Sequence, residues 1–222
     1  MDKLGNFAGD FEVHLTVAPG DADALEQWAH PHGLKLTHIV LDRGRTVSQP
    51  MLTLRATGTL PEVRAVAART VRLLGSAGFR TLRMKIEAAP WNDGVPGSDE
   101  EAAAQPVDRY FEHHVKLVLD PGYPGDLGTP GDLGDLAALA VPHIAHVSRN
   151  ARRVRADGRQ ERFVTQRCRR VGDRTAAARL DALTGALRAA RYDIASVERE
   201  YVVVDSDESL DDGWIDERRN GR

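Results

Sequence analysis

Apolar and polar residues alternate along one heptapeptide that occurs twice in the chain, the second copy 100 residues after the first. The first copy is Phe11-Glu12-Val13-His14-Leu15-Thr16-Val17, and the second is Phe111-Glu112-His113-His114-Val115-Lys116-Leu117. This alternation predicts a strand with one buried face and one polar face. Each strand therefore carries a Glu and a His on its polar face, followed by a Thr or a Lys.

The residues after the first copy predict a short helix, two strands, a longer helix and a last strand. The two middle strands are expected at residues 34–45 and 48–57, and the last at 79–88. Thr59 and Glu62 have the spacing of a capping box, which places the start of the longer helix between them. The order predicted for this half is βαββαβ.

The residues after the second copy predict the same order. We expect strands at 110–119, in a hairpin at 144–170 and at 192–204, a short helix at 135–140, and a longer helix with Asp173 as its N-cap. A Gly- and Pro-rich stretch, 120–134, is expected to form a surface loop.

Two βαββαβ units predict an α+β protein made of two ferredoxin-like repeats, whose antiparallel sheets enclose a polar cleft or barrel. We place the first repeat at residues 1–94, a polar linker at 95–109, and the second repeat, with an acidic C-terminal tail, at 110–222.

Helices are expected to cover the apolar face of each sheet, so the polar face would border the cleft. The first repeat would present Glu12, His14, Thr16, Arg55, Arg83, Lys85 and Glu87 there, and the second Glu112, His114, Lys116, Gln166, Glu198 and Glu200, with Arg167 as a further cationic candidate. Charges on neighbouring strands also neutralise one another on solvated faces, so an ordinary polar surface is an equal alternative.

His14-Leu15-Thr16 resembles the signature of the two-histidine phosphoesterases, which carry His-x-Thr or His-x-Ser on each half of a duplicated fold and cleave cyclic or 2′,5′-linked phosphodiesters. His114-Val115-Lys116 departs from it, because Lys replaces the hydroxyl residue. The resemblance implies that His14 and His114 act as catalytic acid and base, a role that suits imidazole near neutral pH. Thr16 and Lys116 would then hold phosphate oxygens.

The segment Glu112-His113-His114-Val115-Lys116 differs by one residue from the Glu-x-Glu-x-Lys strand of the triphosphate-tunnel enzymes, the family of thiamine triphosphatase and one class of adenylate cyclase. Glu198 and Glu200 resemble a later acidic pair of that family. The resemblance implies a barrel with inward basic residues for phosphates and acidic residues for a divalent metal. His114 in place of the middle Glu weakens a magnesium site, so we predict no metal site and leave the cofactor open.

Composition indicates the cellular compartment in which the protein is expected. A single cysteine, Cys168, excludes an internal disulfide and fits a reducing compartment. No apolar run approaches the ~20 residues of a membrane span, so we expect a cytoplasmic protein without a membrane partner.

Two oppositely charged runs lie close together in the second half. Residues 143–174 contain 10 Arg and 3 acidic residues, and residues 193–217 contain 10 acidic residues and one Arg. We expect them to neutralise each other within the sheet. Aromatic residues form only 5% of the chain, which leaves single-stranded nucleic acid little to stack on and disfavours it as a partner.

The sequence is compatible with two functions. The first is binding or hydrolysis of a phosphorylated small molecule or nucleotide in a polar cleft between the repeats. The second is a non-catalytic module that uses the polar faces for ligand binding, self-association or contact with a partner protein. The sequence leaves open whether the protein is an enzyme, since ferredoxin-like units serve both purposes.

Overall fold

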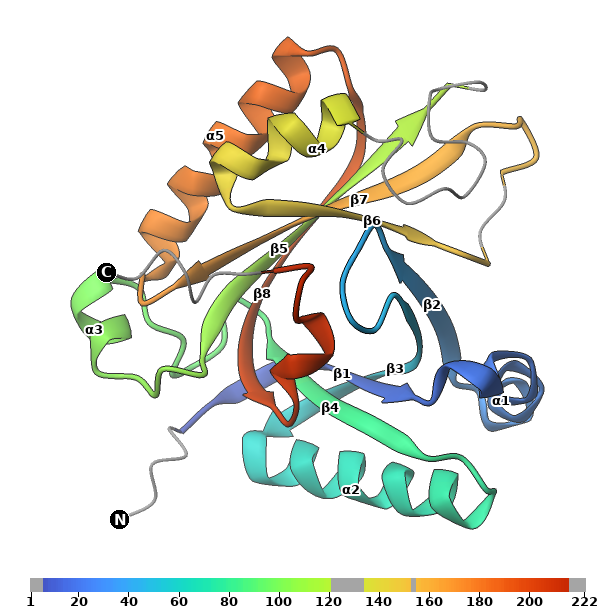
Figure 1. The fold of residues 1–222 in the computed structure, drawn as a ribbon. Coiled ribbons are helices and arrows are strands. Elements are labelled where there is room, and N and C mark those ends of the chain that lie inside the picture. The colour runs from blue at the N-terminus through green and yellow to red at the C-terminus, as the bar shows by residue number, and fades with distance from the viewer. Residues whose placement is uncertain (1–5, 121–133, 153–154, 216–222) are drawn as a thin grey trace.

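The computed structural model describes residues 6–120, 134–152 and 155–215. They form an α+β fold in which antiparallel strands close into a barrel and helices pack on its outside (Figure 1). The loop predicted at 120–134 lies outside the described residues, apart from its two ends.

The strands agree closely with the sequence pattern. They are β1 (Ala8–Val17), β2 (Lys35–Leu41), β3 (Ser48–Thr59), β4 (Thr81–Ala88), β5 (Tyr110–Leu119), β6 (Ala145–Asn150), β7 (Gln160–Arg169) and β8 (Asp193–Asp205).

The described helices lie between these strands. They are α1 (Ala22–Ala29), α2 (Leu60–Ser76), α3 (Asp99–Ala103), α4 (Gly134–Ala140) and α5 (Asp173–Ala189), with 3₁₀ turns η1 (Pro19–Asp21), η2 (His30–His32), η3 (Val141–His143) and η4 (Glu208–Asp211). Among the described segments, no helix has both the length and the apolar character needed to cross a membrane.

The strand order around the barrel is β1-β3-β2-β6-β7-β5-β8-β4. The four strands of each half are neighbours, and the halves join at two seams, where β2 pairs with β6 and β4 pairs with β8. The two sheets therefore continue one another and enclose a common interior.

Helices cover the outside of the barrel in both halves (Figure 1), and apolar side chains pack between them and the strands. Val13, Leu15 and Ile86 are fully buried with α2 residues in the first half, and Val115 and Val164 are fully buried with α5 residues in the second. Because side chains alternate along a strand, the even-numbered residues of β1 and β5 that flank these positions face the barrel interior.

Residues 95–109, predicted as a linker, contain α3. Its start is a capping box like the one at Thr59: the Ser98 backbone N–H donates to Glu101 Oε2 at 3.0 Å, and the Glu101 N–H donates to Ser98 Oγ at 3.3 Å. Gly172 N–H donates to Asp99 Oδ1 at 2.8 Å, which fixes α3 against the start of α5.

The prediction that Asp173 caps α5 is wrong by one residue. Gly172 occupies the N-cap position, and Asp173 is the first residue of the helix. The Asp173 carboxylate instead forms an ion pair with Arg199.

Candidate functional site

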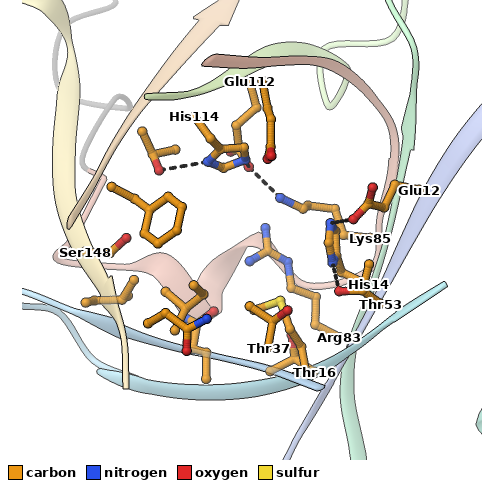
Figure 2. A pocket seen from close by; sticks show the side chains of 18 of the residues that line it. Glu12, His14, Thr16, Thr37, Thr53, Arg83, Lys85, Glu112, His114 and Ser148 are labelled. Atoms are coloured by element: carbon orange, nitrogen blue, oxygen red, sulfur yellow. Dashed lines mark hydrogen bonds and ion pairs between the residues drawn. The ribbon is translucent and has the colours of Figure 1, made fainter. Parts of the chain in front are cut away.

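The barrel encloses a cavity of about 340 Å³, a volume typical of small-molecule sites. All eight strands contribute side chains to its lining, and the two histidines singled out by the sequence face it from different halves (Figure 2).

His14 and His114 have closely similar surroundings. His14 lies on β1 with Nδ1 3.1 Å from Thr53 Oγ1 on β3, and His114 lies on β5 with Nδ1 3.0 Å from Thr165 Oγ1 on β7. His14 Nε2 is 2.9 Å from Glu87 Oε2. Both rings are therefore held by a threonine on one side and by acidic residues on the other.

Lys85 connects the two histidines. Its Nζ lies 2.6 Å from Glu87 Oε1 and 2.5 Å from Glu112 Oε1, and Glu112 Oε1 is 3.4 Å from His114 Nε2. The chain His14, Glu87, Lys85, Glu112, His114 is thus one continuous polar network. Burial alone lowers the pKa of Lys85, but Glu112 and Glu87 outweigh it and raise the pKa above its ordinary value.

At the His114 end of this network, two groups have strongly shifted pKa values. Burial opposes the charged form of His114, but Glu112 and Glu200 raise its pKa to about 10. Burial and repulsion from Glu87 raise the pKa of Glu200 to about 7. His114 is therefore a cation at neutral pH, which favours a role as hydrogen-bond donor or acid over a role as base.

We expect the free energy of unfolding to fall as the pH rises from 4.5 toward 10. Native Glu200 and His114 bind protons more tightly than in the unfolded chain, where their pKa values are near 4.5 and 6.5. Their stabilising contributions are complete below those values and are lost as the pH rises through about 7 for Glu200 and about 10 for His114.

Urea unfolding at a series of pH values measures this dependence. In the variant His114→Gln the decrease between pH 6.5 and 10 should become much shallower. An unchanged slope in the variant would contradict the assignment of the titration to His114.

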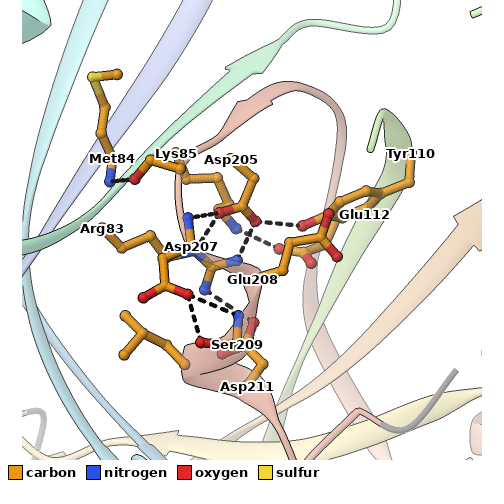
Figure 3. A network of polar contacts seen from close by, with 12 residues as sticks. Arg83, Met84, Lys85, Tyr110, Glu112, Asp205, Asp207, Glu208, Ser209 and Asp211 are labelled. Atoms are coloured by element: carbon orange, nitrogen blue, oxygen red, sulfur yellow. Dashed lines mark hydrogen bonds and ion pairs between the residues drawn. The ribbon is translucent and has the colours of Figure 1, made fainter. Parts of the chain in front are cut away.

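A second cluster in the cavity lining is buried: Arg83 and Arg167 converge on Asp211, and Figure 3 shows the contact between Arg83 and Asp211. Arg83 Nη1 and Arg167 Nη2 lie 2.9 Å and 2.6 Å from the same oxygen, Asp211 Oδ2. Burial opposes ionisation of Asp211, but the two guanidinium groups outweigh it and lower its pKa to about 2. Each arginine has another acidic partner: Asp205 for Arg83 and Glu112 for Arg167.

The outer part of the lining carries exposed charges. Lys35 and Glu26 lie there with Arg152, which forms ion pairs with Glu26 and Asp23 of α1. Lys116 Nζ also lines the cavity, 3.6 Å from Glu161 Oε2.

Ten of the eleven predicted site residues line this one cavity. They are Glu12, His14, Thr16, Arg83, Glu112, His114, Lys116, Arg167, Glu198 and Glu200. Arg55 does not: its side chain is 83% exposed and contacts Glu12 from outside the lining, with Nε 3.3 Å from Glu12 Oε2.

Gln166 lies on the opposite face of the barrel wall from the one predicted. Its Nε2 donates to the His143 carbonyl oxygen at 2.9 Å, and its Oε1 is 3.1 Å from Nδ1 of His113, its neighbour across the strands. Since Thr165 and Arg167 face the cavity, alternation turns Gln166 toward the helices.

Sequence reasoning missed Lys35, Arg152 and Asp211 in the lining. The alternation Lys35, Thr37, Ile39 along β2 was an available signal for the first. The two charged runs contact each other, but not within the sheet as predicted: Arg167 pairs with Asp211 and Arg169 pairs with Glu208 at 2.6 Å, and both acids lie in η4 after the last strand.

Glu87, Glu112 and His114 offer ligand atoms within 4.8 Å of one another, a spacing that suits a metal ion. The Lys85 ammonium, however, contacts both carboxylates. It supplies there the positive charge that a cation would supply, so a metal would bind only if Lys85 moved away.

No protein-family model and no curated protein matches the sequence. Among solved structures, the small subunit of acetolactate synthase from Thermotoga maritima is similar over 88% of this chain and 95% of its own, with 10% identity and a TM-score of 0.27. A chlorite dismutase variant from Candidatus Nitrospira defluvii is similar over 92% of this chain and 93% of its own, with 12% identity and a TM-score of 0.29. At these TM-scores the similarity identifies neither a shared fold nor a shared function.

Proposed function

We propose that the barrel binds a phosphorylated small molecule or nucleotide in its cavity. The observation that carries this proposal is the convergence of cationic groups from both halves on one cavity of about 340 Å³. His114, Lys116 and Lys35 line its accessible part. Cationic donors in a partly desolvated site favour a multiply charged anion over a neutral ligand.

The acidic residues of the lining restrict the class of ligand further. Glu12, Glu198 and Glu200 also face the cavity. Carboxylate oxygens accept hydrogen bonds and cannot donate them to phosphate. A ligand with hydroxyl or amino groups beside its phosphate, such as a nucleotide or a sugar phosphate, would satisfy both parts of the lining.

The arrangement supports binding better than hydrolysis. His114 is protonated at neutral pH, and both ring nitrogens of His14 lie within hydrogen-bonding distance of Thr53 or Glu87. A general base needs a free lone pair directed at the substrate. A duplicated ferredoxin-like architecture is supported by the same βαββαβ order in both halves and by the paired histidines. The resemblance to the two-histidine phosphoesterases implies the same architecture. In this protein, we propose, the two histidines serve ligand binding in place of acid–base catalysis.

The test is a calorimetric and thermal-shift screen with inorganic triphosphate, AMP and 2′,3′-cyclic AMP. A compound at 100 times its Kd should stabilise the protein by about 2.7 kcal/mol. In the double variant Lys35→Met, Lys116→Met, we expect the Kd to rise at least ~10-fold, because each lost charged hydrogen bond costs about 1.5–3 kcal/mol.

Arg69→Ala is the matched control, since Arg69 is exposed on α2 and is absent from the cavity lining. It should leave the Kd unchanged. Failure of all three compounds to bind, or equal affinity in the double variant, would contradict the proposal, and turnover of a bound compound would contradict its restriction to binding.

A further inference from the structure

Asp211 lines the cavity but does not belong to any strand of the barrel. It belongs to η4, the short turn that follows the last strand (Figure 3), and its buried side chain contacts residues of three strands. Oδ2 accepts hydrogen bonds from Arg83 on β4 and Arg167 on β7, and Oδ1 accepts one from Gln49 Nε2 on β3 at 3.0 Å.

These donors form a pocket for an anion. Two guanidinium groups directed at one oxygen, with a side-chain amide beside them, match the geometry that binds carboxylate or phosphate. The arginines also have supports that do not depend on Asp211: Arg83 Nε lies 2.8 Å from Asp205 Oδ1, and Arg167 Nε lies 2.5 Å from Glu112 Oε2. The donors therefore keep their positions when the Asp211 carboxylate is removed.

We infer that Arg83, Arg167 and Gln49 form a buried anion subsite in the cavity lining, specific for a phosphate or carboxylate group, and that Asp211 occupies it as an internal ligand. The inference rests on the proposed function in one respect: the phosphate of the bound molecule competes with Asp211 for the same donors. Asp211 thereby lowers the affinity of the wild-type protein for phosphate, and a ligand that fills the subsite displaces η4.

The variant Asp211→Ala tests this, with orthophosphate as the probe. We expect calorimetry at constant ionic strength to give a Kd for orthophosphate at least ~10-fold lower in the variant than in the wild type, a difference of about 1.4 kcal/mol. Orthophosphate should also raise the melting temperature of the variant more than that of the wild type.

Circular dichroism measures the folded fraction of Asp211→Ala, so the inference can still be tested if the variant folds poorly. If Asp211→Ala folds poorly in chloride, orthophosphate of equal ionic strength should restore it. A variant that gains neither affinity nor stability from orthophosphate would overturn the subsite.

Glu208→Gln is the matched control because it removes a carboxylate from the same turn, one that contacts Arg169. It should bind orthophosphate as the wild type does, and a gain equal to that of Asp211→Ala would also overturn the inference. If the wild type binds no phosphorylated compound but Asp211→Ala binds orthophosphate, the proposed function fails and the subsite stands. If the wild type binds such compounds through Lys35 and Lys116 but Asp211→Ala gains nothing, the subsite alone fails.

Discussion

Replacing Glu112 with glutamine is expected to lower the free energy of unfolding by about 3–5 kcal/mol, the usual cost of removing one partner from a buried ion pair. The Glu112 side chain is 2% exposed and contacts three cationic groups, those of Lys85, Arg167 and His114. A neutral amide would remove one of the two acidic partners of each cationic group inside the barrel and leave only Glu87, Asp211 and Glu200 to compensate them. Urea unfolding at neutral pH measures the loss.

Glu26→Gln is the control, because Glu26 lines the same cavity but is exposed. Its ion pair with Arg152 should contribute no more than about 1 kcal/mol. Equal effects of Glu112→Gln and Glu26→Gln would show that the interior network does not stabilise the barrel.

Replacing Trp214 with alanine is expected to cost about 3–5 kcal/mol of unfolding free energy. Trp214 is buried in a small apolar cluster with Leu41 and Ile215, and its Nε1 donates to the Val147 carbonyl oxygen at 3.0 Å. The cluster anchors the segment after β8 to β2 and β6, so its loss should also loosen Asp211 from the arginines.

Trp91→Ala provides the comparison, since that side chain is 78% exposed. It should change the free energy of unfolding by no more than about 0.5 kcal/mol. If both tryptophan variants had the same small effect, the C-terminal segment would not be an integral part of the barrel.

Local patterns predicted the elements well because each depends on neighbours in the sequence. Alternation around His14 and His114 identified β1 and β5 and the face each turns inward. The spacing of Thr59 and Glu62 located the start of α2, and the same pattern at Ser98 and Glu101 would have revealed α3.

The closure of the barrel was harder to predict because it joins distant parts of the chain. Ile39 pairs with Asn150 at one seam, and Lys85 pairs with Asp205 at the other. No local pattern specifies such contacts. The entry of Asp211 into the cavity has the same origin: it depends on the path of the chain after β8, and composition indicated only that acidic residues would neutralise the arginines.

The most direct test of ligand binding in the barrel is a crystal structure of the wild-type protein soaked with tungstate, a tetrahedral oxyanion that stands in for phosphate. We expect the anomalous signal of tungsten inside the cavity, within hydrogen-bonding distance of Lys116 or His114. It should be absent from crystals of the Lys35→Met, Lys116→Met variant. Tungstate bound only on the outer surface, with an empty barrel, would contradict the account.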